Sequence, residues 1–221
     1  MNRSFLLLLL LLCCHVFTHG GAAIAASAET AKVEVLDFDP KVLPKDAKFQ
    51  GKIVTGARWR DLKGENILLL TQTGKFPTRG KCAEDRCFNA DVYAYHYVKH
   101  DDTVSLLWKL KDYQRNCPFD LYAGFLDESL SITDLDSDGI AESTFLYKLS
   151  CRSDVSPARL KLIMHEGAAK YAIRGTTKMP NGYGGGERAV DRAFDKADTT
   201  LRTFCINKWN QYVAEDHFEQ F

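Results

Sequence analysis

The stretch Ala90-Asp91-Val92-Tyr93-Ala94-Tyr95-His96-Tyr97-Val98 decides the class of fold. Tyrosines at positions 93, 95 and 97 alternate with Val92, Ala94, His96 and Val98. This period of two places the two sets on opposite faces of a β-strand, and aromatic and β-branched residues are common in strands. The polar residues His100-Asp101-Asp102 then predict a turn into a second strand, Thr103–Lys109. The centre of the chain is therefore predicted to be β-structure.

Further segments with the character of strands lie on both sides of this pair. They are Ile53–Arg60 and Asn66–Thr71 before it, and Leu130–Thr133, Ser143–Leu149, Arg159–His165 and Lys170–Ile173 after Cys117-Pro118. In each series an Asp-Leu pair and a polar turn with glycine follow the first strand, at Asp61–Glu65 and at Asp134–Glu142. This similarity predicts a weak internal duplication. Two such units cannot close a propeller, so we predict an open twisted antiparallel sheet or a sandwich.

The C-terminal part of the chain loses the period of two. After a loop rich in glycine and proline, Met179–Arg188, apolar residues recur at spacings of about three, four and seven. This pattern predicts an amphipathic helix from about Asp198, whose side chain would cap the first free backbone N–H groups. The helix is expected to cover one face of the sheet, so the fold class is mainly β (α+β) with a C-terminal amphipathic helix.

The N-terminal residues 1–28 have the order of a cleavable signal peptide. Arg3 gives a positive head, Phe5–Cys14 is an apolar run, and Ala26-Ser27-Ala28 fits the small-x-small cleavage pattern. We predict cleavage after Ala28, with Ala23 or Ala26 as alternatives. The apolar run falls short of the roughly 18–20 residues needed to span a bilayer. The chain is therefore expected to be periplasmic or secreted.

The remaining sequence predicts an extended lead-in over residues 29–49 and one β-rich domain with the C-terminal helix over residues 50–221. No stretch after Ala28 is long and apolar enough to be a transmembrane segment. The whole chain carries 29 Lys and Arg residues and 29 Asp and Glu residues, with interspersed signs. Nucleic-acid binding needs clustered Lys and Arg, so no nucleic-acid partner is expected.

Five cysteines remain after the predicted cleavage, and disulfides are the default in an oxidising compartment. Five cysteines forming two bridges allow fifteen arrangements, so the sequence leaves the pairing open. The pairing that we favour is Cys82–Cys87, which closes a short polar loop, together with Cys117–Cys151, which ties two strand ends. Cys205 lies in the helical stretch and is expected to be a buried free thiol.

The strongest local signal is the loop Asp134-Leu135-Asp136-Ser137-Asp138-Gly139-Ile140-Ala141-Glu142. Ca²⁺ prefers six to eight oxygen ligands, and carboxylates at positions one, three and five of a tight loop supply such oxygens. Gly139 permits the sharp turn. The predicted ligands are Asp134, Asp136 and Asp138, the backbone carbonyl of Ile140, and Glu142 directly or through water.

The loop departs from an EF-hand, because Phe145 stands where the bidentate glutamate should be and strands flank it. It is similar to the calcium loops between strands in integrin-type FG-GAP repeats. The alternative is an acidic turn without an ion, in which the aspartates accept hydrogen bonds from the backbone. We expect Ca²⁺ here as a structural ion.

Two distinctive pieces of sequence are Asp154-Val155-Ser156-Pro157 and Tyr171-Ala172-Ile173-Arg174-Gly175. With them the chain, over roughly Trp59 to the C-terminal helix, resembles a family of exported bacterial proteins labelled surface polysaccharide biosynthesis protein. The resemblance implies a location in the bacterial cell envelope or outside the cell, and it carries no catalytic residues.

Three functions follow as hypotheses. The first is a non-enzymatic exported module of the cell envelope, stabilised by calcium and linked to surface polysaccharide or to an envelope protein. The second is a hydrolase of envelope glycan or peptide that draws its acids from Asp120, Asp127, Glu128 and Asp154. The third is a partner-binding inhibitor or chaperone-like protein that presents the tyrosines of Val92–Val98, although β-propensity favours packing of these tyrosines on a face of the sheet. The absence of a catalytic motif favours the first.

Overall fold

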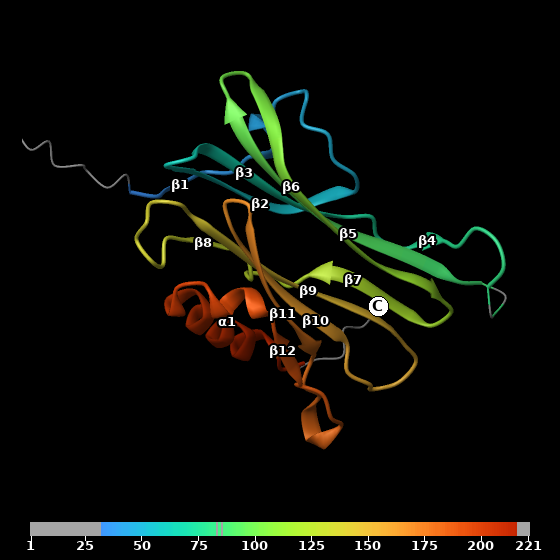
Figure 1. The fold of residues 1–221 in the computed structure, drawn as a ribbon. Coiled ribbons are helices and arrows are strands. Elements are labelled where there is room, and N and C mark those ends of the chain that lie inside the picture. Colours follow the sequence, from blue (N-terminus) through green and yellow to red (C-terminus); the bar gives the residue numbers. More distant parts are fainter. Residues whose placement is uncertain (1–31, 83, 85, 216–221) are drawn as a thin grey trace, which may run out of the picture.

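The computed structural model describes residues 32–82, 84 and 86–215. The predicted signal peptide, residues 1–28, lies outside these residues. Two six-stranded antiparallel sheets pack face to face, and one α-helix covers the outer face of the second sheet (Figure 1). The predicted fold class is confirmed. No helix in the described ranges is long and apolar enough to cross a membrane.

The first sheet contains the first predicted series of strands. Its order is β1-β2-β3-β5, and β4 and β6 also pair with β5. Its strands are β1 (Glu34–Leu36), β2 (Lys52–Asp61), β3 (Gly64–Gln72), β4 (Phe76–Pro77), β5 (Phe88–His100) and β6 (Thr103–Cys117).

The second sheet contains the second predicted series. Its order is β12-β11-β10-β9-β7, and β8 also pairs with β9. Its strands are β7 (Asp120–Phe125), β8 (Ser131–Thr133), β9 (Glu142–Arg152), β10 (Arg159–Glu166), β11 (Ala169–Thr176) and β12 (Arg188–Val190). All eight predicted strands are present, and β1, β4, β7 and β12 are additional.

The helix α1 (Thr199–Tyr212) begins as predicted, because the Asp198 carboxylate accepts a hydrogen bond from the Thr200 N–H at 2.8 Å. The loop predicted over Met179–Arg188 contains a short 3₁₀ turn. Three 3₁₀ turns are described, at Pro40–Val42, Pro180–Gly182 and Arg192–Asp195. The lead-in is thus more structured than predicted, because it contains β1 and the first of these turns.

Two apolar cores lie on the two faces of the second sheet. The core between the sheets joins residues such as Leu68 and Val92 to Phe145 and Leu149 of β9. The core beneath α1 contains Leu146, Leu162, Met164, Leu201 and Trp209. Strand β9 contributes to both cores and is therefore buried on both faces, and its buried residues include the polar Glu142 and Lys148.

The tyrosines of β5 lie on the outer face of the first sheet and are only 2–3% exposed. Phe38, Leu43 and Ala47 of the lead-in pack against them. The Gln50 N–H donates to the Tyr95 hydroxyl at 3.0 Å, and the Tyr97 hydroxyl donates to the Lys48 carbonyl at 2.6 Å. These tyrosines therefore belong to the core of the protein and do not form an exposed face.

The cysteine pairing that the sequence favoured is present. Cys82 pairs with Cys87, and Cys117 at the end of β6 pairs with Cys151 in β9, so the second bridge joins the two sheets. The chain-entropy estimate for its 34-residue separation is about 4 kcal/mol. Cys205 is free and buried, and burial raises the pKa of its thiol to about 12.

Replacing Trp209 by alanine should destabilise the protein by about 3–5 kcal/mol, because it leaves a cavity between α1 and the second sheet. Trp209 is fully buried. The measurement is the free energy of unfolding in urea, with Gln211→Ala as an exposed control on the same helix. A loss no larger than that of the control would contradict the described packing of α1.

Candidate metal centre

The acidic loop connects β8 to β9. One carboxylate oxygen from each of Asp134, Asp136 and Asp138 lies within 4.8 Å of the others. Ser137 and Gly139 have φ angles of 61° and 79°, so the backbone turns sharply between the aspartates. The sequence therefore correctly predicted that these three side chains converge at a glycine-containing turn.

Hydrogen bonds within the loop also involve the carboxylates. The Asp138 N–H donates to Asp136 Oδ1 at 3.3 Å, and the Ile140 N–H donates to Asp138 Oδ1 at 2.7 Å. Each carboxylate retains further lone pairs, so these bonds are compatible with an ion as well as with an acidic turn. Asp134 Oδ1 is buried and has no hydrogen-bond partner within the described part of the chain.

Glu142, the first residue of β9, is fully buried. Its carboxylate accepts a hydrogen bond from the Thr133 hydroxyl at 2.8 Å and one from the Leu135 N–H at 3.1 Å. It belongs to a second group of acidic oxygens within 4.8 Å of one another, formed with Asp136 and Glu166. The predicted ligands are thus divided between two groups that share Asp136.

Glu166 belongs to the second acidic group but was not among the ligands predicted from the sequence. Glu166 is the last residue of β10 and lies directly opposite Glu142 in the register of β9 and β10. Its carboxylate also accepts a hydrogen bond from the Tyr171 hydroxyl at 3.2 Å. Only the register of this strand pair brings the two glutamates together, and no local sequence motif encodes it.

The five carboxylates repel one another. Burial is the largest cause of the raised pKa of Glu142, and the charge of Asp136 adds to it. Burial likewise raises the pKa of Glu166, with further contributions from Asp136, Asp138 and Asp134. Among the described residues no Lys or Arg forms an ion pair with any of the five. The site therefore has excess negative charge and oxygen ligands only, as a Ca²⁺ site requires.

The loop is also joined to the first sheet, at the turn between β2 and β3. The Leu62 N–H donates to the Gly139 carbonyl at 2.9 Å, and the Ala141 N–H donates to Asp61 Oδ2 at 3.2 Å. Asp61 also accepts hydrogen bonds from the Trp59 indole N–H and the Asn66 side-chain amide, at 2.9 and 3.0 Å. The two turns whose similarity predicted a duplication therefore contact each other.

Two buried histidines, His96 and His165, both lie against the ring of Trp108. His96 Nε2 is 2.9 Å from Asn66 Oδ1, and the ring distance from Trp108 to His165 is 3.9 Å. Burial lowers the pKa of His96 to about 4 and that of His165 to about 3. His100, four residues after His96, is exposed, and its Nε2 lies 3.1 Å from the Ser105 hydroxyl.

The acids considered for a hydrolase lie apart. Asp127 and Glu128 line a groove between the sheets, and neither Asp120 nor Asp154 is among the residues that line it. Asp154 accepts a hydrogen bond from the Ser156 N–H at 2.9 Å, and Asp120 pairs with Arg152 in the register of β7 and β9. The four acids therefore do not form one carboxylate site.

Comparison of the chain with models of known families, with curated proteins and with solved structures finds no match.

Acid should destabilise the protein through the two buried histidines. Because their pKa values are lowered in the folded state, the unfolded chain binds protons more readily, and stability falls as the pH drops below about 6.5 towards 4. The loss is at most about 1.4 kcal/mol per pH unit for each histidine.

Urea unfolding of the wild type and of His165→Gln between pH 7.5 and 5.5 measures this loss. The difference in pH dependence between the two proteins removes the contribution of the carboxylates. His100→Gln is the exposed control. Equal pH slopes for wild type and His165→Gln would contradict the expectation.

Asp61→Ala should reduce the free energy of unfolding by about 1–3 kcal/mol, because buried donors lose their acceptor. Hydrogen exchange of the Ala141 amide should accelerate in the same variant. Asp102→Ala, in an exposed turn, is the control. If both variants have the same stability, the Asp61 carboxylate does not hold the two turns together.

Proposed function

We propose that this chain is an exported, non-enzymatic β-sandwich module of the bacterial cell envelope, in which Ca²⁺ at residues 134–142 stabilises the contact between the sheets. The observation that carries the metal site is the pair of three-carboxylate groups that share Asp136, with no Lys or Arg ion pair to any of these acids in the described ranges. Asp134, Asp136, Asp138 and Glu166 would supply side-chain oxygens, and Ile140 its carbonyl.

Glu142 has a different role in this proposal from that of the aspartates. Both of its oxygens already accept hydrogen bonds from the loop. Glu142 is buried next to Asp136, and both the burial and the neighbouring negative charge disfavour its ionised carboxylate. A bound cation would therefore stabilise the ionised form of Glu142 as well as the loop. We therefore assign Glu142 to holding the shape of the loop, with ligation to the ion directly or through water.

The ion would act on the whole fold through the turn between β2 and β3. The loop contacts that turn through the Gly139 carbonyl and the Ala141 amide, which bond Leu62 and Asp61. Fixing the aspartates would keep these two groups in place and so reduce the local opening of the sheets. This is a structural role for the metal, with no catalytic step.

The location and the class of partner rest on other observations. Two cysteine pairs at disulfide distance and the predicted signal peptide support an oxidising, exported setting. The sequence resemblance supports a link with surface polysaccharide. The hydrolase alternative is weaker because its four acids do not share a site, and presentation of the β5 tyrosines is weaker because residues of the lead-in cover them.

Calcium should raise the melting temperature and stabilise the protein by about 2.7 kcal/mol when the free ion is 100-fold above its dissociation constant. Differential scanning fluorimetry with Ca²⁺, with Mg²⁺ and with EGTA tests the stabilisation, and titration calorimetry tests the binding. Asp136→Asn should abolish both responses, because Asp136 belongs to both acidic groups. Asp102→Asn is the matched control outside the loop.

The Asp136→Asn variant should differ from the wild type in the opposite direction when calcium is removed. In EGTA, Asp136→Asn should be at least as stable as the wild type, because it removes repulsion among the carboxylates. No heat and no change in melting temperature for the wild type with Ca²⁺ would refute the metal site and leave an acidic turn.

A further inference from the structure

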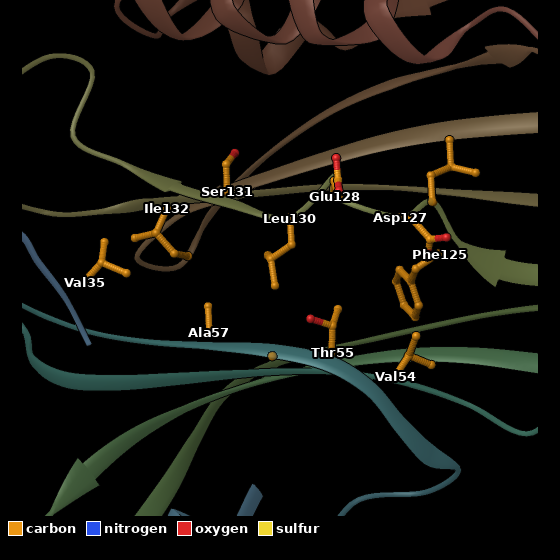
Figure 2. Close-up of a pocket in the computed structure, with 12 residues that line it drawn as sticks. Val35, Val54, Thr55, Ala57, Phe125, Asp127, Glu128, Leu130, Ser131 and Ile132 are labelled. Carbon is orange, nitrogen blue, oxygen red and sulfur yellow. The ribbon is translucent and has the colours of Figure 1, made fainter. Parts of the chain in front are cut away.

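A groove of about 560 Å³ lies along one side of the sandwich, between β2 of the first sheet and the segment that joins β7 to β8 of the second. Figure 2 shows Phe125, Leu130 and Ile132 pointing from the second sheet towards Val54 and Ala57 of β2. These side chains make the walls between the sheets apolar. The groove is separate from the tyrosine face, which is covered.

The floor of this groove is an open strand edge. β1 pairs with β2 only at Arg58–Arg60, so the outer edge of β2 from Lys52 to Ala57 has no neighbouring strand among the described residues. Val54 is 43% exposed on this edge. Unpaired N–H and C=O groups in a row are a template for another strand.

The side of the groove opposite β2 is formed by β7, β8 and the segment between them, and it is also the edge of a sheet. β7 and β8 both pair with β9, through Phe125–Tyr147 and Ser131–Thr144 in the register. No further strand pairs with β7 or β8 in the part of the chain that the structure describes. The groove therefore runs between two open edges, and an extended chain in it would have apolar side chains on both sides.

One end of the groove is acidic. Asp127 and Glu128 are exposed there, and neither forms an ion pair with a described residue. Glu128 has a φ angle of 57°, a left-handed conformation that is unfavourable for a residue with a side chain. An acidic rim beside an apolar groove favours an occupant that carries a basic residue next to apolar ones.

We propose that the groove binds an extended segment of a partner protein, which adds as a strand along Lys52–Ala57 of β2. Backbone hydrogen bonds to β2 would supply affinity, and alternate apolar side chains would enter between the sheets. A basic residue would lie beside Asp127. At about 3.3 Å per residue, the free edge of β2 matches a segment of about six residues.

A library of phage-displayed random octapeptides tests this proposal directly. Selection is made on the wild-type protein and, in parallel, on Val54→Lys, which places a charge at an exposed position of the β2 edge. We expect peptides with alternating apolar residues and at least one Lys or Arg to be enriched on the wild type alone. Absence of enrichment over the variant, or enrichment without this pattern, would refute the proposal.

The most enriched peptide is then made synthetically and measured by fluorescence anisotropy and by amide chemical shifts. Shifts should concentrate at Lys52–Ala57, and N-methylation of alternate peptide nitrogens should weaken binding at least ten-fold through lost hydrogen bonds. Asp127→Lys should weaken it about five-fold, as expected for an exposed ion pair, whereas Asp102→Lys should leave it unchanged.

The same measurements distinguish two other occupants of the groove, an apolar small molecule and a second copy of the chain. Binding that is insensitive to N-methylation would show a site for apolar small molecules and would overturn strand addition. A protein that is dimeric without peptide, and monomeric as Val54→Lys, would show that a second copy of the chain occupies the edge, which also overturns the proposal.

Discussion

The contact between the two sheets depends on the Asp61 carboxylate. It lies in the turn between β2 and β3, is almost fully buried, and accepts hydrogen bonds from both sheets. A buried carboxylate is unfavourable without such donors, so its presence requires the loop after β8 to stay where the Ala141 amide can reach it. The apolar core between the sheets is non-directional, whereas this contact sets how one turn lies on the other.

The position of the acidic loop follows from that constraint. Gly139 and Ala141 are held against the first sheet, so the aspartates before them and Glu142 after them have little freedom to move apart. The strand register then adds Glu166 beside Glu142. Negative charge is thus concentrated by the fold, and a divalent cation is the ligand that would offset it while satisfying several oxygens at once. Hydrogen bonds from the loop backbone offset part of that charge, and this partial compensation is what the acidic-turn alternative relies on.

Features encoded by neighbouring residues could be predicted from the sequence. Alternation in Val92–Val98 predicted a strand, Asp198 predicted the start of the helix, and the spacing of Asp134, Asp136 and Asp138 predicted their convergence. The lead-in was only partly predictable, because β1 is three residues long and is stabilised by pairing with β2.

Features that depend on contacts between distant segments could not be predicted. Glu166 joins the acidic group only through the pairing of β9 with β10, and Asp61 meets Ala141 only when the sheets pack. The tyrosines of β5 gave no local sign that the lead-in would cover them. The turns Asp61–Glu65 and Asp134–Glu142 have similar sequences, but nothing in either turn shows that the two would contact each other.

The acidic loop and the open groove are linked through β8. Ile132 of this three-residue strand lines the groove, and the next residue, Thr133, donates to Glu142 beside the acidic loop. A strand this short has few hydrogen bonds of its own, so its position depends on what holds its ends. A cation that fixes the loop would therefore also fix one wall of the groove. Binding of a strand between the sheets would, by reciprocity, favour the arrangement of the loop that binds the ion. The metal and the partner would therefore both stabilise the position of β8 described here, each acting at one end of the strand.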